Sequence, residues 1–184
     1  MPSASAHIAA AKIVKDKLNI KDDNFYIGAL LPDILDMDKR VSHFKKQGSF
    51  FLVPKLDEYK NTHDLKDMTN LGYYLHLYID YYFLEDYLFN NNPNIDVFNS
   101  NLIYKDYDIL NKKVLDRFNV DKDEIIKILE SIKDDKVSQR KLNNNIECLN
   151  KDKDGELILL KEKLFLDFIE KYSIQFVKEL DKSV

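Results

Sequence analysis

The order of hydrophobic and polar residues along this chain favours α-helices over strands. Near the start, Ile8, Ala11 and Val14 follow one another at helical spacing, which predicts one apolar face. A serine at position 3 or 5 can cap this helix, because its side-chain oxygen accepts from a free backbone N–H of the first turn. We therefore predict a first helix that runs to about Leu18.

The most hydrophobic stretch runs from about Thr69 to Phe89, and its apolar residues are spread almost all round a helix. A helix of this kind is typically buried on every side. We expect residues 69–89 to form the central buried helix of the fold, and the asparagine-rich segment 90–94 to end it.

Shorter signals divide the remaining chain. Because proline disfavours a helical conformation at the residue before it, Pro32 is expected to end one element and open another. Residues 36–66 look irregular. Asp121 with Glu124 three residues later predicts a capped helix. Further helices are predicted at 142–149 and 155–180.

Composition supports one all-α domain. The chain has 184 residues with only 4 glycines and 4 prolines, which suits helices joined by short connections. The net charge of −4 argues against a dedicated nucleic-acid face. Cys148 is the single cysteine, so no internal disulfide is expected. The start of the chain does not resemble a signal peptide and no transmembrane run is present, so we expect a cytoplasmic protein. The oligomeric state is left open.

Candidate chemistry begins with His76 and Asp80. They lie four residues apart on the predicted central helix, so their side chains are neighbours on one face. A metal ion can join an imidazole to a carboxylate there. A simple His–Asp hydrogen bond within the core is the structural alternative.

Three other residues are weak signals individually. His7 near the start of a helix is typical of a surface or capping residue. Asp33 after a proline is typical of an N-cap, and His43 of an ordinary loop histidine. Their order along the chain is more informative than each position alone.

That order resembles the zinc-dependent phospholipase C family, most of all its short bacterial members, which share a helical fold with zinc-dependent single-strand nucleases. The similarity covers about residues 1–90. It consists of an early histidine, then F-x-x-G-x-x-x-P-D, then S-H-F, then L-G-Y-x-x-H-x-x-x-D. The resemblance implies a helical bundle whose residues 1–90 carry the metal site, with residues 91–184 as packing helices.

The resemblance further implies a ligand set. Asp33, His43, His76 and Asp80 would bind one zinc ion, and Asp80 would bridge to a second ion that His7 also binds. The implied activity is phosphoester hydrolysis, of a phosphodiester or a lipid headgroup, by water activated at the metal. Asp33 or Asp80 would be the base.

The chain also departs from the family. It has no tryptophan, and no histidine follows His76, so the third zinc site of the larger enzymes has no counterpart. Glu85 and Asp86 could replace missing carboxylates, although exposed helix charges are the simpler interpretation. His63 could lie at the rim of the cleft. The four-ligand site is therefore complete and the bridged site only half present.

Two other interpretations stay open. An HD-type phosphohydrolase would use His43, His63 and Asp64, with Asp80 as the later aspartate. This assignment leaves the His76 segment unexplained. Alternatively, the protein is a non-catalytic helical binding or scaffold protein that holds one structural metal ion or none.

Overall fold

The protein is built from packed α-helices, which confirms the all-α prediction. The computed structural model describes residues 2–48, 51–88 and 100–181. Within these ranges no β-strand forms, and two isolated bridges, Leu35 with Val137 and Lys45 with Pro54, tie loops together. The segment expected to end the central helix, residues 90–94, lies outside the described residues. No helix of the described ranges combines the length and the apolar character needed to cross a bilayer.

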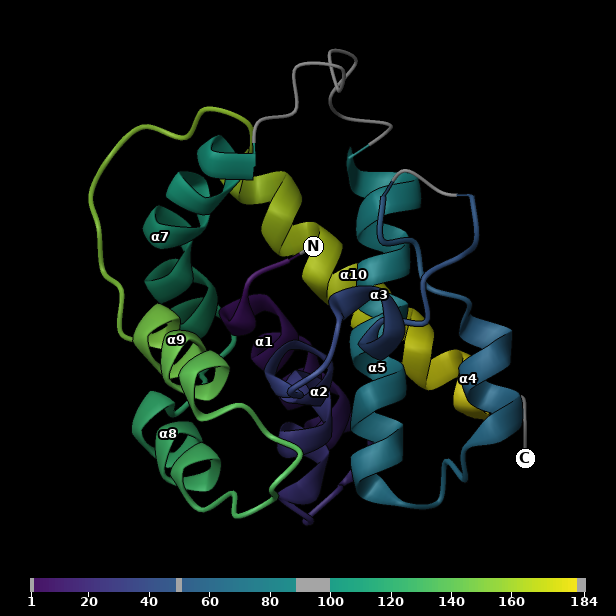
Figure 1. Cartoon of the computed structure of the whole chain (residues 1–184). Helices are drawn as coiled ribbons and strands as arrows, with labels where there is room; N and C mark the ends of the chain where they lie inside the picture. Colours follow the sequence, from purple (N-terminus) through teal and green to yellow (C-terminus); the bar gives the residue numbers. More distant parts are fainter. Residues whose placement is uncertain (1, 49–50, 89–99, 182–184) are drawn as a thin grey trace.

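Figure 1 shows how the helices follow one another, with a long loop between the last two helices. The segments in chain order are α1 (Ala4–Leu18), α2 (Asn24–Ile34), α3 (Lys39–Ser42), α4 (Leu56–Thr62), α5 (Met68–Tyr82) and its π-helical continuation η1 (Phe83–Leu88), then α7 (Ser100–Arg117), α8 (Lys122–Glu130), α9 (Gln139–Leu149) and α10 (Glu162–Asp181).

Two helices form the centre of the bundle. Every residue of α5 from Leu71 to Asp80 is buried, as expected for a helix that is apolar all round. The first two turns of α1 are equally enclosed, because their alanines let neighbouring helices approach closely, and α1 contacts α2, α5, α7, α9 and α10. Figure 1 shows α1 and α2 between α5 on one side and α7 to α9 on the other, with α10 crossing the bundle.

The tightest packing joins α2 to α5, and it depends on two glycines. A Cβ added at Gly72 would overlap the backbone carbonyl of Phe25, and one added at Gly28 would overlap the carbonyl of Thr69. The two backbones therefore lie in direct contact. This contact places the end of α2 against the face of α5 that carries His76 and Asp80.

Two predicted boundaries are wrong. Pro32 lies inside the last turn of α2 instead of separating two elements. Proline removes only one backbone hydrogen bond there, and the close packing on α5 stabilises the continuous helix. The last helix begins at Glu162, not at Gly155. The chain before it is irregular, because Asp106 accepts from the backbone N–H groups of residues 158–160.

Other local predictions fit better. The helix α8 is capped by Asp121, whose side chain accepts from the N–H of Glu124 at 3.0 Å, so the predicted cap is confirmed. Residues 36–66 contain the short helices α3 and α4 between irregular stretches. The amphipathic helix α7 was not among the predicted elements.

Candidate metal centre

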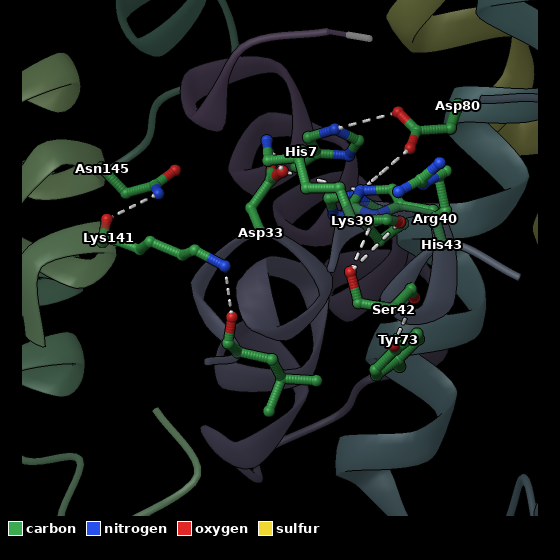
Figure 2. A network of polar contacts seen from close by, with 12 residues as sticks. His7, Asp33, Lys39, Arg40, Ser42, His43, Tyr73, Asp80, Lys141 and Asn145 are labelled. Carbon is green, nitrogen blue, oxygen red and sulfur yellow. Dashed lines mark hydrogen bonds and ion pairs between the residues drawn. The ribbon is translucent and has the colours of Figure 1, made fainter. Parts of the chain in front are cut away.

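Five titratable side chains meet in the interior of the bundle. They come from α1, α2, the end of α3 and α5, and each is at most 9% exposed. Figure 2 shows part of this cluster. Its members are His7, Asp33, His43, His76 and Asp80. The structure thus brings together the five residues that the sequence had picked out.

The pair on α5 has the geometry that its spacing predicts. Nε2 of His76 lies 3.3 Å from Oδ2 of Asp80. On its other side, Nδ1 of His76 lies 2.8 Å from the carbonyl oxygen of Ala29 in α2. The close approach of α2 and α5 therefore determines how the His76 ring is oriented.

His43 joins the cluster from the C-terminal end of α3. Its Nε2 lies 3.3 Å from Nε2 of His76, 3.5 Å from Oδ1 of Asp33 and 3.7 Å from Oδ2 of Asp80. Its Nδ1 lies 2.9 Å from the carbonyl oxygen of Lys39. His43 therefore connects the carboxylate of α2 with the pair on α5.

His7 enters from α1. Its ring stacks on the His76 ring with centroids 3.7 Å apart and an interplanar angle of 9°. Its Nε2 lies 3.4 Å from Oδ1 of Asp80. The two oxygens of Asp80 thus face different histidines, since Oδ1 faces His7 and Oδ2 faces His76.

The contacts behind the rings bear on where the protons lie. A backbone carbonyl only accepts, so Nδ1 of His76 carries the proton that the carbonyl of Ala29 accepts. Nδ1 of His43 lies near both the carbonyl of Lys39 and the hydroxyl of Ser42. When His43 carries its proton on Nδ1, the Nε2 atoms of the two neutral rings present lone pairs to each other at 3.3 Å, and a proton or a metal ion between them would join them. When His43 carries its proton on Nε2, that atom donates to Nε2 of His76 instead.

Polar atoms in the cluster also lack partners. Among the described residues, neither oxygen of Asp80 and neither ring nitrogen of His7 has a hydrogen-bond partner, and all four atoms are buried. A buried polar atom without a partner costs about 1–3 kcal/mol. A bound cation would satisfy the Asp80 oxygens and one nitrogen of His7.

The pKa shifts of the cluster agree with the need for a positive charge beside Asp80. Burial and, to a lesser degree, the charge of His76 lower the pKa of His7 to about 4. Burial also acts against the charged form of His76, but Asp80 outweighs it and raises the pKa of His76. For Asp80, burial is outweighed by His76 and His7, which lower its pKa. These directions favour a charged His76 beside an ionised Asp80.

Asp33 is the carboxylate nearest to solvent. Burial opposes its ionisation, but the neighbouring His43 and the charges of His76 and Lys39 hold its pKa well below the ordinary value. Nζ of Lys39 lies 2.8 Å from Oδ1 of Asp33. The carboxylate is therefore ionised, as a metal ligand must be.

The distances among the donor atoms suit a tetrahedral ion. Zinc bonds of about 2.1 Å imply ligand atoms about 3.4 Å apart. The contacts of His43 Nε2 with His76 and Asp33, and that of His76 with Asp80, span 3.3–3.5 Å, and the contact of His43 with Asp80 is 3.7 Å. Two overlapping groups, His7–Asp33–His76 and His43–His76–Asp80, have all their ligand atoms within 4.8 Å. These buried residues fit a metal ion.

The other candidates lie apart from these two groups. His63 stacks on Tyr59 with ring centroids 4.0 Å apart, and its Nδ1 faces the hydroxyl of Thr62. Asp64 accepts from the backbone N–H of Lys66. Among the described residues, neither His63 nor Asp64 belongs to the two groups that could hold a metal ion. The structure therefore does not bring His63 and Asp64 together with His43, as an HD-type site would need.

The acidic residues that follow Asp80 also face elsewhere. Glu85 is exposed. Asp86 accepts a hydrogen bond from Tyr172 and pairs with Lys171 of α10 at 3.1 Å. Neither belongs to the described groups of ligand atoms.

Sequence reasoning missed Lys39, which touches the cluster twice. Its side chain pairs with Asp33 and its backbone carbonyl accepts from His43. Lys39 and Asp33 also line a pocket of about 420 Å³ that extends to α7 and α9. The sequence did offer one signal for Lys39. It precedes His43 by four residues, and residues at this spacing lie next to each other across one helical turn.

The tyrosines of α5 pack in the core. Tyr74 and Tyr78 lie against Phe176 of α10, with ring centroids 5.6 and 5.2 Å away. Tyr73 differs, because its hydroxyl donates to the carbonyl of Ser42 and so holds the turn that carries His43.

Comparison of the chain with protein-family models, with curated proteins and with solved structures gave no match.

Proposed function

We propose that the cluster binds zinc and that the protein is a metal-dependent phosphoester hydrolase. The observation that carries the metal proposal is the pair of facing Nε2 atoms, His43 with His76, beside the unpartnered carboxylate of Asp80. Imidazole and carboxylate donors together are typical of zinc. The four donors that the phospholipase C resemblance implies for one ion are Asp33, His43, His76 and Asp80.

A second position is half formed. Oδ1 of Asp80 faces Nε2 of His7, which supports a bridging role for this carboxylate. A second ion there would take its further donors from solvent or substrate when Asp33 and His76, which also lie near His7, are ligands of the first ion. We therefore propose one resident ion and a second that binds with the substrate.

The bound ion would supply a Lewis acid that polarises a phosphoryl group and lowers the pKa of water. The protein supplies the rest. Asp33 borders both the cluster and the pocket, whereas Asp80 is fully buried and does not line the pocket. Of the two candidate bases, Asp33 is thus the one that can accept a proton from a molecule in the pocket. Lys39 beside it can neutralise developing negative charge.

The burial of the cluster favours a second candidate function. His43, His76 and Asp80 are all 0% exposed, and a closed four-ligand shell is typical of structural zinc. In that case the ion would join α1, α2 and α5 in a scaffold and no hydrolysis would occur. The position of Asp33 at the pocket favours the hydrolase.

Metal analysis distinguishes both zinc-binding proposals, the hydrolase and the scaffold, from a protein that binds no metal. Protein purified without added metal should contain about one zinc ion per chain by mass spectrometry, and His43→Ala or Asp80→Asn should remove it. His63→Ala is the matched control, because it removes a histidine outside the cluster. A wild-type protein with no transition metal, which also fails to take up added zinc, would refute the metal proposal.

Activity separates hydrolase from scaffold. The zinc-loaded protein should cleave a chromogenic phosphodiester or phosphomonoester, such as a nitrophenyl phosphate. Asp33→Asn should reduce the turnover more than it reduces the zinc content. A folded, zinc-loaded protein that cleaves neither these compounds nor a phospholipid would instead establish the scaffold role.

A further inference from the structure

A pocket lies beside the metal cluster and opens toward α7 and α9. Its volume of about 420 Å³ falls within the range of small-molecule sites. Asp33 and Lys39 form the side that borders the cluster, and Tyr104 of α7, with 61% of its surface exposed, also lines the pocket. Figure 2 shows Asp33 and Lys39 on the side of the cluster that faces Lys141 and Asn145 of α9.

The charge of this pocket is opposite to that of the protein. The whole chain has a net charge of −4, but more lysines than acidic residues line the pocket. The lining lysines are Lys39, Lys105, Lys141 and Lys151, and the acidic residues are Asp33 and Asp108. Asparagines at 111, 144 and 145 add neutral hydrogen-bonding groups. A pocket of this composition suits a small anion that carries several acceptor oxygens.

Two of the lysines are held by other groups. Nζ of Lys141 donates to the carbonyl oxygens of Leu35 and Met37 at 2.7 and 2.9 Å. Nζ of Lys151 pairs with Asp108 at 3.0 Å. These lysines raise the local potential, but some of the three donors on each are already engaged. Their contribution to a ligand is therefore mainly electrostatic.

Lys39 is different because its partner is a proposed metal ligand. Its Nζ lies 2.8 Å from Oδ1 of Asp33, the same oxygen that lies 3.5 Å from Nε2 of His43. A metal ion and the lysine would compete for this carboxylate. The Lys39 side chain is 47% exposed, so it can leave Asp33 without disturbing the core.

We propose that the pocket binds a small phosphate-bearing ligand, and that Lys39 transfers from Asp33 to the phosphate when the metal ion binds. This inference rests on the proposed metal site. Without metal, Lys39 neutralises Asp33. With metal, the ion neutralises Asp33, and the freed ammonium group points a strong donor into the pocket. Metal and anion therefore assist each other, since a coupling between two sites is reciprocal.

The substitution Lys39→Met tests this exchange because it moves two affinities in opposite directions. Without the competing ammonium group, zinc should bind more tightly, by roughly tenfold, the size of one charge-assisted hydrogen bond. Inorganic phosphate should bind to the zinc-loaded protein more weakly by a similar factor. Competition with a chromophoric chelator measures the zinc affinity, and titration calorimetry measures the phosphate affinity.

Lys105→Met is the matched control. Lys105 lines the same pocket, but its ammonium group has no described contact with Asp33. This variant should weaken phosphate binding and leave zinc binding unchanged. A thermal melt of each variant in chelator shows whether the fold is intact, and phenyl phosphate in place of phosphate shows whether the pocket accepts an ester.

The outcomes distinguish this inference from the proposed function. If wild-type protein binds no zinc, the proposed function fails. If it binds zinc and phosphate but Lys39→Met leaves zinc affinity unchanged or weaker, the exchange is refuted while the metal site stands. Equal phosphate affinity with and without zinc would also refute the exchange. An increase in zinc affinity together with a loss of phosphate affinity would establish it.

Discussion

Replacing Gly72 by alanine would test whether the contact between α2 and α5 shapes the metal centre. The added Cβ would lie 2.9 Å from the backbone nitrogen of Ala29 and 3.1 Å from the carbonyl carbon of Gly28, and it would overlap the carbonyl oxygen of Phe25. These are backbone atoms, so none can rotate away. Because the added Cβ would lie 2.2 Å from the oxygen of Phe25, the helix α2 must shift by roughly 1.3–1.8 Å to restore ordinary contact distances of about 3.5–4.0 Å.

The shift would reach the cluster through His76. Its Nδ1 lies 2.8 Å from the carbonyl oxygen of Ala29. A displacement of more than about 1 Å would lengthen this N···O distance beyond the usual range for a hydrogen bond. Overpacking costs about 1–3 kcal/mol and the lost hydrogen bond about 1 kcal/mol. Because alanine has a higher helix propensity than glycine, the substitution also stabilises α5 by about 1 kcal/mol. The net loss of unfolding free energy is therefore about 1–3 kcal/mol.

For a chain of this size, that loss lowers the melting temperature by roughly 3–10 °C. Zinc affinity should fall by about 10–100-fold, because a group that orients a ligand has been displaced. Differential scanning calorimetry and chelator competition measure the two effects. Gly155→Ala is the control, since its Cβ would meet only the flexible end of the Ile109 side chain. The reasoning is refuted if Gly72→Ala melts at the wild-type temperature and binds zinc as tightly.

Three further substitutions test other parts of the fold. Asp121→Ala removes the cap of α8 and should lower the free energy of unfolding by about 1 kcal/mol without changing the zinc content. An unchanged melting temperature would show that Asp121 does not stabilise the helix. Tyr59→Phe removes a buried hydroxyl that has no partner among the described residues, so chemical denaturation should show equal or greater stability. Asp106→Asn weakens the acceptor for the N–H groups of residues 158–160, so hydrogen exchange of these amides should accelerate while that of Leu129 does not.

Local patterns in the sequence were sufficient for part of this protein. The apolar surface of residues 71–80 required burial on every side, and it is buried. The cap at Asp121 acts within three residues, so no distant contact can remove its signal. His76 and Asp80 are neighbours because helical geometry places residues four apart on one face. These features depend on neighbours in the chain.

Tertiary structure decided the features that depend on distant partners. Pro32 stays helical because α5 packs against α2, and the last helix starts late because Asp106, more than fifty residues earlier, accepts the N–H groups before it. The approach of His7 to His76 and the pocket that joins Lys39 to α9 also come from packing. The sequence identified the residue types that suit a metal ion. Only the packing of α1, α2, α3 and α5 brought these side chains together in two overlapping groups, each with its ligand atoms within 4.8 Å, because such contacts leave no local periodicity.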